Sequence, residues 1–402
     1  MDEPAPSSYS GRPLSRRGGR RRSPGAAGGW LGRFLGAVLA AALAGALAVA
    51  CTPREPLRIG FLAGLSGPAA DLGNGAYNGA RLAVEEFNAL GGVQGRTVEL
   101  LVRDDKGDRA TAQQQFGELA QAGVELVIGP TTSTMALALA PLADERRVAL
   151  LSPTATTAEL SGRDDHFLRL VAPLTALARE QARHLYQLGA RKLVLATGGG
   201  NPTYVANYSR EVIAAFRQAG GTVEPAVAYG GSEGAATSYE LTAQAVLASR
   251  PDALLMIAAG GDVALLALQV RKLGGPKWLA SAHWADTPRL LQAGGADIEG
   301  LIVTQYFDPD SRESAFLQFA ARYRERFSEA PGFAGIYGYD TTRYALAALA
   351  KRTPGQSAKQ ALLALPVQSG LQGPLQMDAH GDGLAPAKLA QVRGGKIVAL
   401  PR

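Results

Sequence analysis

The fold is decided by the stretch Leu57-Arg58-Ile59-Gly60-Phe61-Leu62-Ala63-Gly64-Leu65-Ser66-Gly67-Pro68. Its first six residues predict a short β-strand, which the glycines and the proline that follow bring to an end. Residues 77–90 then predict a helix, because apolar residues recur at spacings of four and three and Gly91-Gly92 stops the pattern. A strand followed by an amphipathic helix is the repeating unit of a parallel sheet covered by helices.

The same alternation runs along most of the chain. Residues 97–103, 126–128 and 148–151 predict further strands with helices between them, and after residue 169 the pattern restarts and runs to residue 304. Two more helices and a strand-like end, residues 391–400, complete the chain. The predicted fold class is therefore α/β, with two doubly wound parallel-sheet lobes and a ligand cleft between them. In such sheets ligands bind outside the carboxyl ends of the strands.

Residues 1–50 predict a secretory signal peptide. A block of arginines at residues 16–22 precedes residues 34–50, which are wholly apolar or glycine, and the sole cysteine, Cys51, follows at once. This order resembles a bacterial lipobox, in which Cys51 carries the lipid anchor and becomes the first residue. An uncleaved membrane anchor is the alternative. Either way, we expect the rest of the chain to be exported and tethered at the periplasmic face of a bacterial membrane.

Composition and motifs argue against several classes of function. The first 50 residues hold seven arginines against two acids, so nearly all of the net charge of +6 belongs to the leader and no basic surface for nucleic acid remains. No cysteine is left for a disulfide, a thiolate metal site or a nucleophile. His166, His184 and His380 lack metal-ligand spacing, and no Gly-x-Ser-x-Gly or dinucleotide-binding motif is present. We expect no enzyme activity, no metal and no cofactor.

Several short motifs follow one another along the chain in a characteristic order. They are Ile59 to Pro68, Asn88-Ala89-Leu90-Gly91-Gly92-Val93-Gln94-Gly95, Val127-Ile128-Gly129-Pro130, Leu151-Ser152-Pro153-Thr154-Ala155-Thr156 and Tyr337-Gly338-Tyr339-Asp340. This set resembles the leucine/isoleucine/valine-binding family of periplasmic proteins, the solute-capturing subunits of ABC importers, over essentially all of residues 57–402. The resemblance implies a type I periplasmic binding fold with three crossover strands, near Val171, Tyr306 and residue 370. The lobes would comprise residues 57–171 plus 307–369, and residues 172–306 plus 370–402.

The resemblance also implies which residues hold the carboxylate of a ligand. The family uses the loops that follow two neighbouring strands, and by motif the contacts here are Ser133, Thr154 and Thr156, with Thr132 and Ala155 as secondary candidates. Hydroxyls and free N–H groups at the start of a helix also suit an anion on physical grounds. The alternative is that Thr132 or Ser133 only caps its helix and that Thr154 only belongs to a turn.

Across the cleft, the resemblance favours Tyr204 as an aromatic cover for the ligand, with a packing tyrosine as the alternative. Family members that bind amino acids place an acid where His283 stands here, because a desolvated ammonium needs a charged partner. His283 and Trp284 instead offer a stacking surface and a neutral donor, which suit an aromatic or amide-bearing acid. Asp262 and Asp286 lie nearby in the sequence and could replace the missing acid or merely cap helices.

These features predict a solute-binding lipoprotein that captures a small carboxylate-bearing metabolite, such as an amino acid or a related acid or amide, by lobe closure. An ABC permease would be its partner. The alternative is a ligand sensor of the same fold, or a structural periplasmic partner with a degenerate pocket. The sequence leaves the ligand, and the choice between transport and sensing, open.

Overall fold

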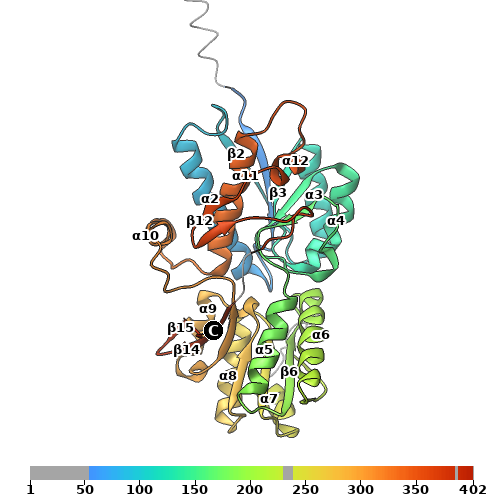
Figure 1. The fold of residues 1–402 in the computed structure, drawn as a ribbon, viewed down its shortest axis with the longest axis vertical. Coiled ribbons are helices and arrows are strands. Elements are labelled where there is room, and N and C mark those ends of the chain that lie inside the picture. Colours follow the sequence, from blue (N-terminus) through green and yellow to red (C-terminus); the bar gives the residue numbers. More distant parts are fainter. Residues whose placement is uncertain (1–53, 230–238, 385–387, 402) are drawn as a thin grey trace, which may run out of the picture. The chain divides into compact units, whose positions relative to one another are not determined.

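The structure is a computed structural model that describes residues 54–229, 239–384 and 388–401 (Figure 1). These residues form two lobes, each built around its own sheet. The predicted signal peptide and Cys51 lie outside the described residues. No helix in the described part of the chain is long and apolar enough to cross a membrane.

The first lobe contains a five-stranded parallel sheet with strand order β2-β1-β3-β4-β5. Strand β1 is paired on both sides, with Phe61 opposite Val102 in β2 and Ile128 in β3. Both faces of the sheet are apolar, so helices cover both: α2 and α11 on one face, α3 and α4 on the other. The strands are β1 (Leu57–Ala63), β2 (Val98–Asp104), β3 (Leu126–Ile128), β4 (Ala149–Ser152) and β5 (Phe167–Arg169). The helices are α2 (Ala70–Ala89), α3 (Arg109–Gln121), α4 (Ser133–Arg146), α10 (Ser314–Phe327), α11 (Phe333–Ala350) and α12 (Ala358–Leu363).

The second lobe is built on an eight-stranded sheet with the order β15-β14-β11-β10-β9-β6-β7, in which β8 also pairs with β6. Helices α5 and α6 cover one face, and α7, α8 and α9 cover the other. The strands are β6 (Lys192–Gly198), β7 (Thr222–Val223), β8 (Val227–Tyr229), β9 (Ala253–Ile257), β10 (Trp278–Ser281), β11 (Ile302–Gln305), β14 (Lys388–Arg393) and β15 (Lys396–Ala399). The helices are α5 (Thr175–Gln187), α6 (Pro202–Gln218), α7 (Tyr239–Ala248), α8 (Gly260–Lys272) and α9 (Pro288–Gly294).

The structure confirms the predicted α/β class and the two sheets, and it corrects the strand-like end of the chain. Residues 391–400 are not one strand, because Gly394 and Gly395 both adopt positive φ and turn the chain into the antiparallel hairpin β14–β15. The second sheet is therefore parallel except at this edge. Residues 222–229 likewise contain two short strands, β7 and β8. A separate small hairpin, β12 (Gln368–Gly370) with β13 (Gly373–Leu375), follows α12.

Helix α2 begins at Ala70, seven residues before the start predicted from the sequence. Glycines in α2 and α11 allow these two helices to touch. A Cβ added at Gly79 would lie 2.1 Å from the carbonyl oxygen of Gly335 in α11, and one added at Gly338 would lie 2.2 Å from that of Ala76. The backbones of α2 and α11 therefore approach too closely for any side chain at these positions.

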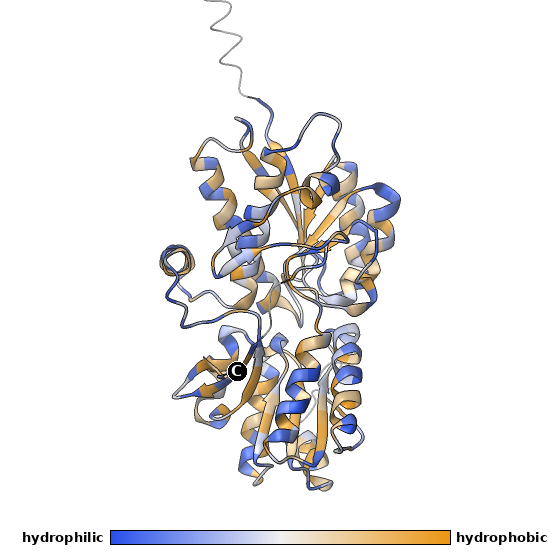
Figure 2. Cartoon of the chain, in the orientation of Figure 1, coloured by the Kyte–Doolittle hydropathy of each residue, from blue (hydrophilic) through white to orange (hydrophobic). Residues whose placement is uncertain are grey.

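The two lobes share one continuous apolar core. The cluster under α2 and α11 in the first lobe extends to that under α5 and α6 in the second. Figure 2 shows apolar strands inside both lobes and helices that carry polar residues on part of their surface. The chain passes between the sheets three times, after β5, after β11 and before β14. The exact lobe boundaries near residues 171, 306 and 370 stay a prediction.

A buried arginine binds the first crossover to the third. Arg169 ends β5 and is fully buried, and its guanidinium pairs with Asp382 at 2.7 Å. The same guanidinium donates hydrogen bonds to the carbonyl oxygen of Thr157 at 2.7 Å and to the hydroxyl of Ser161 at 2.6 Å. Its backbone N–H donates to the carbonyl oxygen of Gly381. One side chain thus ties together β5, the loop after β4 and the third crossover.

We predict that Arg169→Leu lowers the free energy of unfolding by about 3–5 kcal/mol, because Asp382 would remain as an unpaired, largely buried charge. Urea unfolding measures the change. The matched control is Arg58→Leu, which breaks the solvent-exposed pair with Glu99 and should cost less than about 1 kcal/mol. Equal, small effects for both variants would contradict the structural role of Arg169.

Candidate functional site

The candidate site lies where the carboxyl ends of the two sheets meet. The loops after β3 and β4 of the first lobe contact the start of α6 in the second through direct hydrogen bonds. The hydroxyl of Thr134 donates to Asn201 Oδ1 at 2.9 Å and accepts from the backbone N–H of Thr203 at 3.1 Å. The side-chain amide of Asn207 donates to Glu159 at 2.8 Å. The lobes are therefore in contact along the edge where ligands of open α/β sheets bind.

Two hydroxyl residues predicted for the carboxylate, Ser133 and Thr156, share an unusual environment. Ser133 is the first residue of α4 and 1% exposed, and Thr156 follows β4 and is fully buried. Neither hydroxyl has a hydrogen-bond partner among the described residues. A buried hydroxyl without a partner costs free energy, and neither group would have to break an existing bond to meet a ligand oxygen.

The other three candidates of the first lobe already form hydrogen bonds within the protein. The hydroxyl of Thr132 caps α4, accepting from the N–H of Met135 at 3.3 Å, as the alternative interpretation had it. The Thr154 hydroxyl donates to the carbonyl oxygen of Thr131 at 2.6 Å, and the N–H of Ala155 donates to Ser152 Oγ at 2.9 Å. These bonds shape the two loops, and of the five candidates only Ser133 and Thr156 have hydroxyls without a partner among the described residues.

In the second lobe, Tyr204 and His283 come together. The Tyr204 hydroxyl lies 2.9 Å from His283 Nδ1, and both side chains are buried. Tyr306 and Phe333 pack edge-on against the imidazole, with ring centroids 4.8 and 5.6 Å away. Phe333 begins α11 of the first lobe, so this aromatic cluster spans both lobes. Burial lowers the pKa of His283 from 6.5 to about 3, which makes it a neutral group.

Trp284 extends this aromatic surface. Its ring meets that of Tyr204 edge-on at 6.0 Å, and it lies close to Gly200 at the start of the α6 segment. The indole Nε1 is buried and has no acceptor within the described ranges, and the same holds for the hydroxyl of Ser281, the last residue of β10. Both are unused polar groups close to His283 in the chain, and Ser281 was not predicted because no local pattern distinguishes it from other residues at the end of a strand.

The two candidate acids are separated by the structure. Asp262 accepts a hydrogen bond from the hydroxyl of Tyr239 at 2.7 Å and lines a cavity of about 890 Å³ between the lobes. Residues of the first lobe, among them Asp71, Thr134 and Met135, form the opposite wall. Asp286 does not line this cavity, and it faces a different one. Of the two acids, only Asp262 borders the space between Thr134 and α8.

Residues that join the lobes were not predicted. Asn201 precedes Pro202 at the start of α6 and has the sequence of a helix cap, yet its side chain crosses to Thr134 instead of capping the helix. Likewise the hydroxyl of Thr287 donates to Asp71 of the first lobe at 3.1 Å. Nothing local in the sequence distinguishes such residues from ordinary caps, because their partners are more than 60 positions away.

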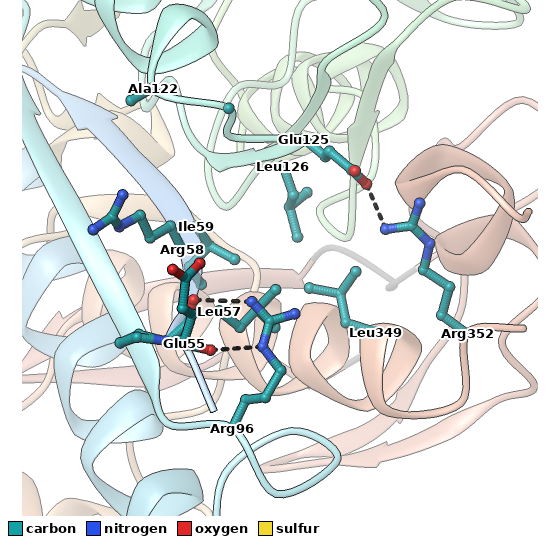
Figure 3. Close-up of a pocket in the computed structure, with 12 residues that line it drawn as sticks. Glu55, Leu57, Arg58, Ile59, Arg96, Ala122, Glu125, Leu126, Leu349 and Arg352 are labelled. Carbon is teal, nitrogen blue, oxygen red and sulfur yellow. Dashed lines mark hydrogen bonds and ion pairs between the residues drawn. The ribbon is translucent and has the colours of Figure 1, made fainter. Parts of the chain in front are cut away.

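A further cavity, of about 510 Å³, lies at the opposite ends of the first-lobe strands (Figure 3). Its arginines are engaged: Arg96 donates to the carbonyl oxygens of Glu55 and Pro56, at 2.8 and 2.9 Å, and Arg352 pairs with Glu125. It shares no residue with the predicted site. No group of three metal-ligating side chains comes together anywhere in the described part of the chain.

A family model described as periplasmic binding protein matches residues 56–396. The chain belongs to the periplasmic binding protein family. Membership implies an exported, periplasmic protein, and the solved structures that resemble this periplasmic binding protein are solute-binding proteins, not enzymes.

A Leu/Ile/Val-binding protein of Rhizobium johnstonii is 36% identical over 107 residues, which are 27% of this chain and 29% of that protein. The chain thus aligns with about a third of the length of the curated relatives it matches. Two solved structures share the fold over 86% of the chain, each with a TM-score of 0.76. They are a branched-chain amino acid transporter substrate-binding protein from Streptococcus pneumoniae (23% identity, 99% of that chain covered) and a solute-binding protein from Rhodopseudomonas palustris (20%, 96%).

The buried His283 predicts a specific dependence of stability on pH. Its pKa is about 3 in the folded protein, against 6.5 ordinarily, so below pH 6.5 the unfolded chain gains a proton that the folded one does not. Below pH 6.5, this residue alone should therefore lower the free energy of unfolding by up to about 1.4 kcal/mol for each unit by which the pH is decreased. His283→Gln should reduce that slope in unfolding experiments between pH 7.5 and 4.5. A slope in His283→Gln like that of the parent would contradict the burial argument.

Proposed function

We propose that this protein is an extracytoplasmic solute-binding lipoprotein that captures a small carboxylate-bearing metabolite by lobe closure and delivers it to an ABC importer. The observation that carries the proposal is the pair of buried, unpartnered hydroxyls, Ser133 and Thr156, at the seam between the lobes. Two hydroxyls can donate to one carboxylate, and hydrogen bonds to a charged group are the stronger kind.

In the second lobe, the position of His283 supplies no acidic side chain to the ligand. A neutral imidazole and the free indole N–H of Trp284 replace the charged partner that a desolvated ammonium would require. The isoleucine complex of the S. pneumoniae protein and the 3,4-dihydroxybenzoic acid complex of the R. palustris protein indicate two ligand classes within this fold. The aromatic cluster around His283 favours the second class, an aromatic or amide-bearing acid.

Direct bonds between the lobes support closure as the capture mechanism. Thr134 with Asn201, Glu159 with Asn207 and Asp71 with Thr287 each join one lobe to the other. A ligand held by Ser133 on one side and Trp284 on the other would favour the same closed arrangement, and an importer could then recognise that arrangement. The tether would be lipid on Cys51; loss of fatty-acid labelling in Cys51→Ala tests that part of the proposal.

The first experiment is a thermal-shift screen of the purified protein against amino acids, aromatic carboxylates, their amides and small peptides. A ligand present at about 1,000 times its Kd should add about 4 kcal/mol to the free energy of unfolding. Hits confined to carboxylates without an α-amine would support the proposal. A panel without any hit would instead favour a sensor or structural partner whose pocket is degenerate.

For a carboxylate that binds, Ser133→Ala combined with Thr156→Val should weaken binding by about 3–6 kcal/mol, because two hydrogen bonds to a charge are lost. Calorimetric titration measures the change. The free energy of unfolding should hardly fall, since neither hydroxyl bonds to the protein. Thr154→Val is the matched control: it loses the bond to Thr131 and should lower stability more than affinity. Unchanged affinity in the double variant would place the ligand elsewhere.

A further inference from the structure

A second cavity between the lobes, of about 400 Å³, is separate from the one that Asp262 lines. It lies among α9, the crossover after β11, the start of β15 and residues 330–332 before α11. The two cavities have no lining residue in common. Thr287, which lines this one, donates its hydroxyl to Asp71, which lines the other, so that hydrogen bond stands between them.

The floor of this cavity is polar and buried. Asp286 is 3% exposed, and Gln305, the last residue of β11, is fully buried. The Gln305 Nε2 donates to Asp286 Oδ2 at 2.9 Å, while Gln305 Oε1 has no donor among the residues that the structure describes. A carboxyl group and an amide oxygen therefore stand side by side, and both are hydrogen-bond acceptors.

The walls are apolar, and the charge of the lining is negative. Asp310 and Lys396, both exposed, are its remaining charged residues beside Asp286, which leaves one net negative charge when all three are ionised. The apolar walls come from both lobes and the crossover: Pro288, Leu291, Phe307, Pro331 and Ile397. A pocket of this size with apolar walls and a few polar groups is typical of small-molecule sites.

We propose that this cavity binds a small organic cation, a protonated primary amine with a compact apolar body, with Asp286 as counter-ion and Gln305 Oε1 as second acceptor. An ammonium carries three N–H donors and no acceptor, which matches the two acceptors of the floor, the Asp286 carboxylate and Gln305 Oε1. It would also supply the opposite charge that a buried carboxylate needs. A carboxylate ligand, by contrast, would meet like charge here.

The ionisation of Asp286 fits this assignment. Burial raises the pKa of Asp286 to about 7, and the hydrogen bond from Gln305 opposes that rise only in part. The other titratable groups of the lining, Asp310 and Lys396, lie at the exposed rim, and Arg289 on α9 lines the other cavity. Cation binding therefore requires loss of the Asp286 proton, and affinity should increase with pH until that proton is gone.

The test is calorimetric or saturation-transfer NMR titration of the purified protein with benzylamine, with benzyl alcohol as the uncharged probe of the same shape. Benzylamine should bind and benzyl alcohol should bind far more weakly. The affinity for the amine should increase about tenfold per pH unit from 5 towards 7 and level off above. Asp286→Asn should weaken it at least about thirtyfold, as for loss of one partner of a buried charged pair.

Two further variants distinguish a loss of the binding site from a loss of the fold. Leu291→Trp, which fills the cavity from its wall, should abolish binding while Asp286 is retained, and Asp310→Asn at the rim should change affinity less than about threefold. Thermal melts verify that each variant is folded. The Ser133→Ala/Thr156→Val variant should bind the amine as the parent does, so this test is independent of the carboxylate site. No binding to the parent protein, unchanged binding in Asp286→Asn, or loss in the Ser133/Thr156 variant would overturn the proposal.

Discussion

The buried guanidinium of Arg169 is the interaction on which the arrangement of the site depends. It ends β5, pairs with Asp382 of the third crossover, and donates to carbonyl oxygens in the loop that carries Thr156. A charge taken out of water is stable only when all its donors are satisfied. Each of these segments must therefore take one position relative to the others. The site loop of the first lobe and the connection to the second are thus held by a single side chain.

Several buried polar groups near the seam between the lobes show the opposite behaviour. Hydroxyls at Ser133, Thr156 and Ser281 and the indole N–H of Trp284 are buried without partners among the described residues. Proteins rarely leave such groups unsatisfied, because each costs free energy. Their concentration at the carboxyl ends of β3, β4 and β10 distinguishes this edge from the cavity at the other end of the first lobe, where the arginines are already paired.

The side chains near His283 differ in chemistry from those near Asp286. On the side of His283, the structure presents neutral donors and aromatic rings, because burial keeps the imidazole uncharged. On the side of Asp286, it presents acceptors and a carboxyl whose pKa burial raises to about 7. The cavity beside Asp286 and the one that Asp262 lines both lie at this seam. Both are bordered by residues of both lobes, so occupancy of either would bear on how firmly the lobes stay together.

The sequence by itself determined the α/β class, the two sheets and the family motifs, because apolar periodicity and the glycines after strands are local signals. It also placed Ser133 and Thr156 after two neighbouring strands, and the structure then showed that their hydroxyls have no partner among the described residues. Only the tertiary structure decided which candidates were already used, such as Thr154, and that Asp286 faces a cavity of its own. It alone revealed Asn201 as a link between lobes and the glycines of α2 as a helix contact. The hydrogen-bond partners and the burial of a side chain depend on residues distant in sequence, so no local sequence pattern predicts them.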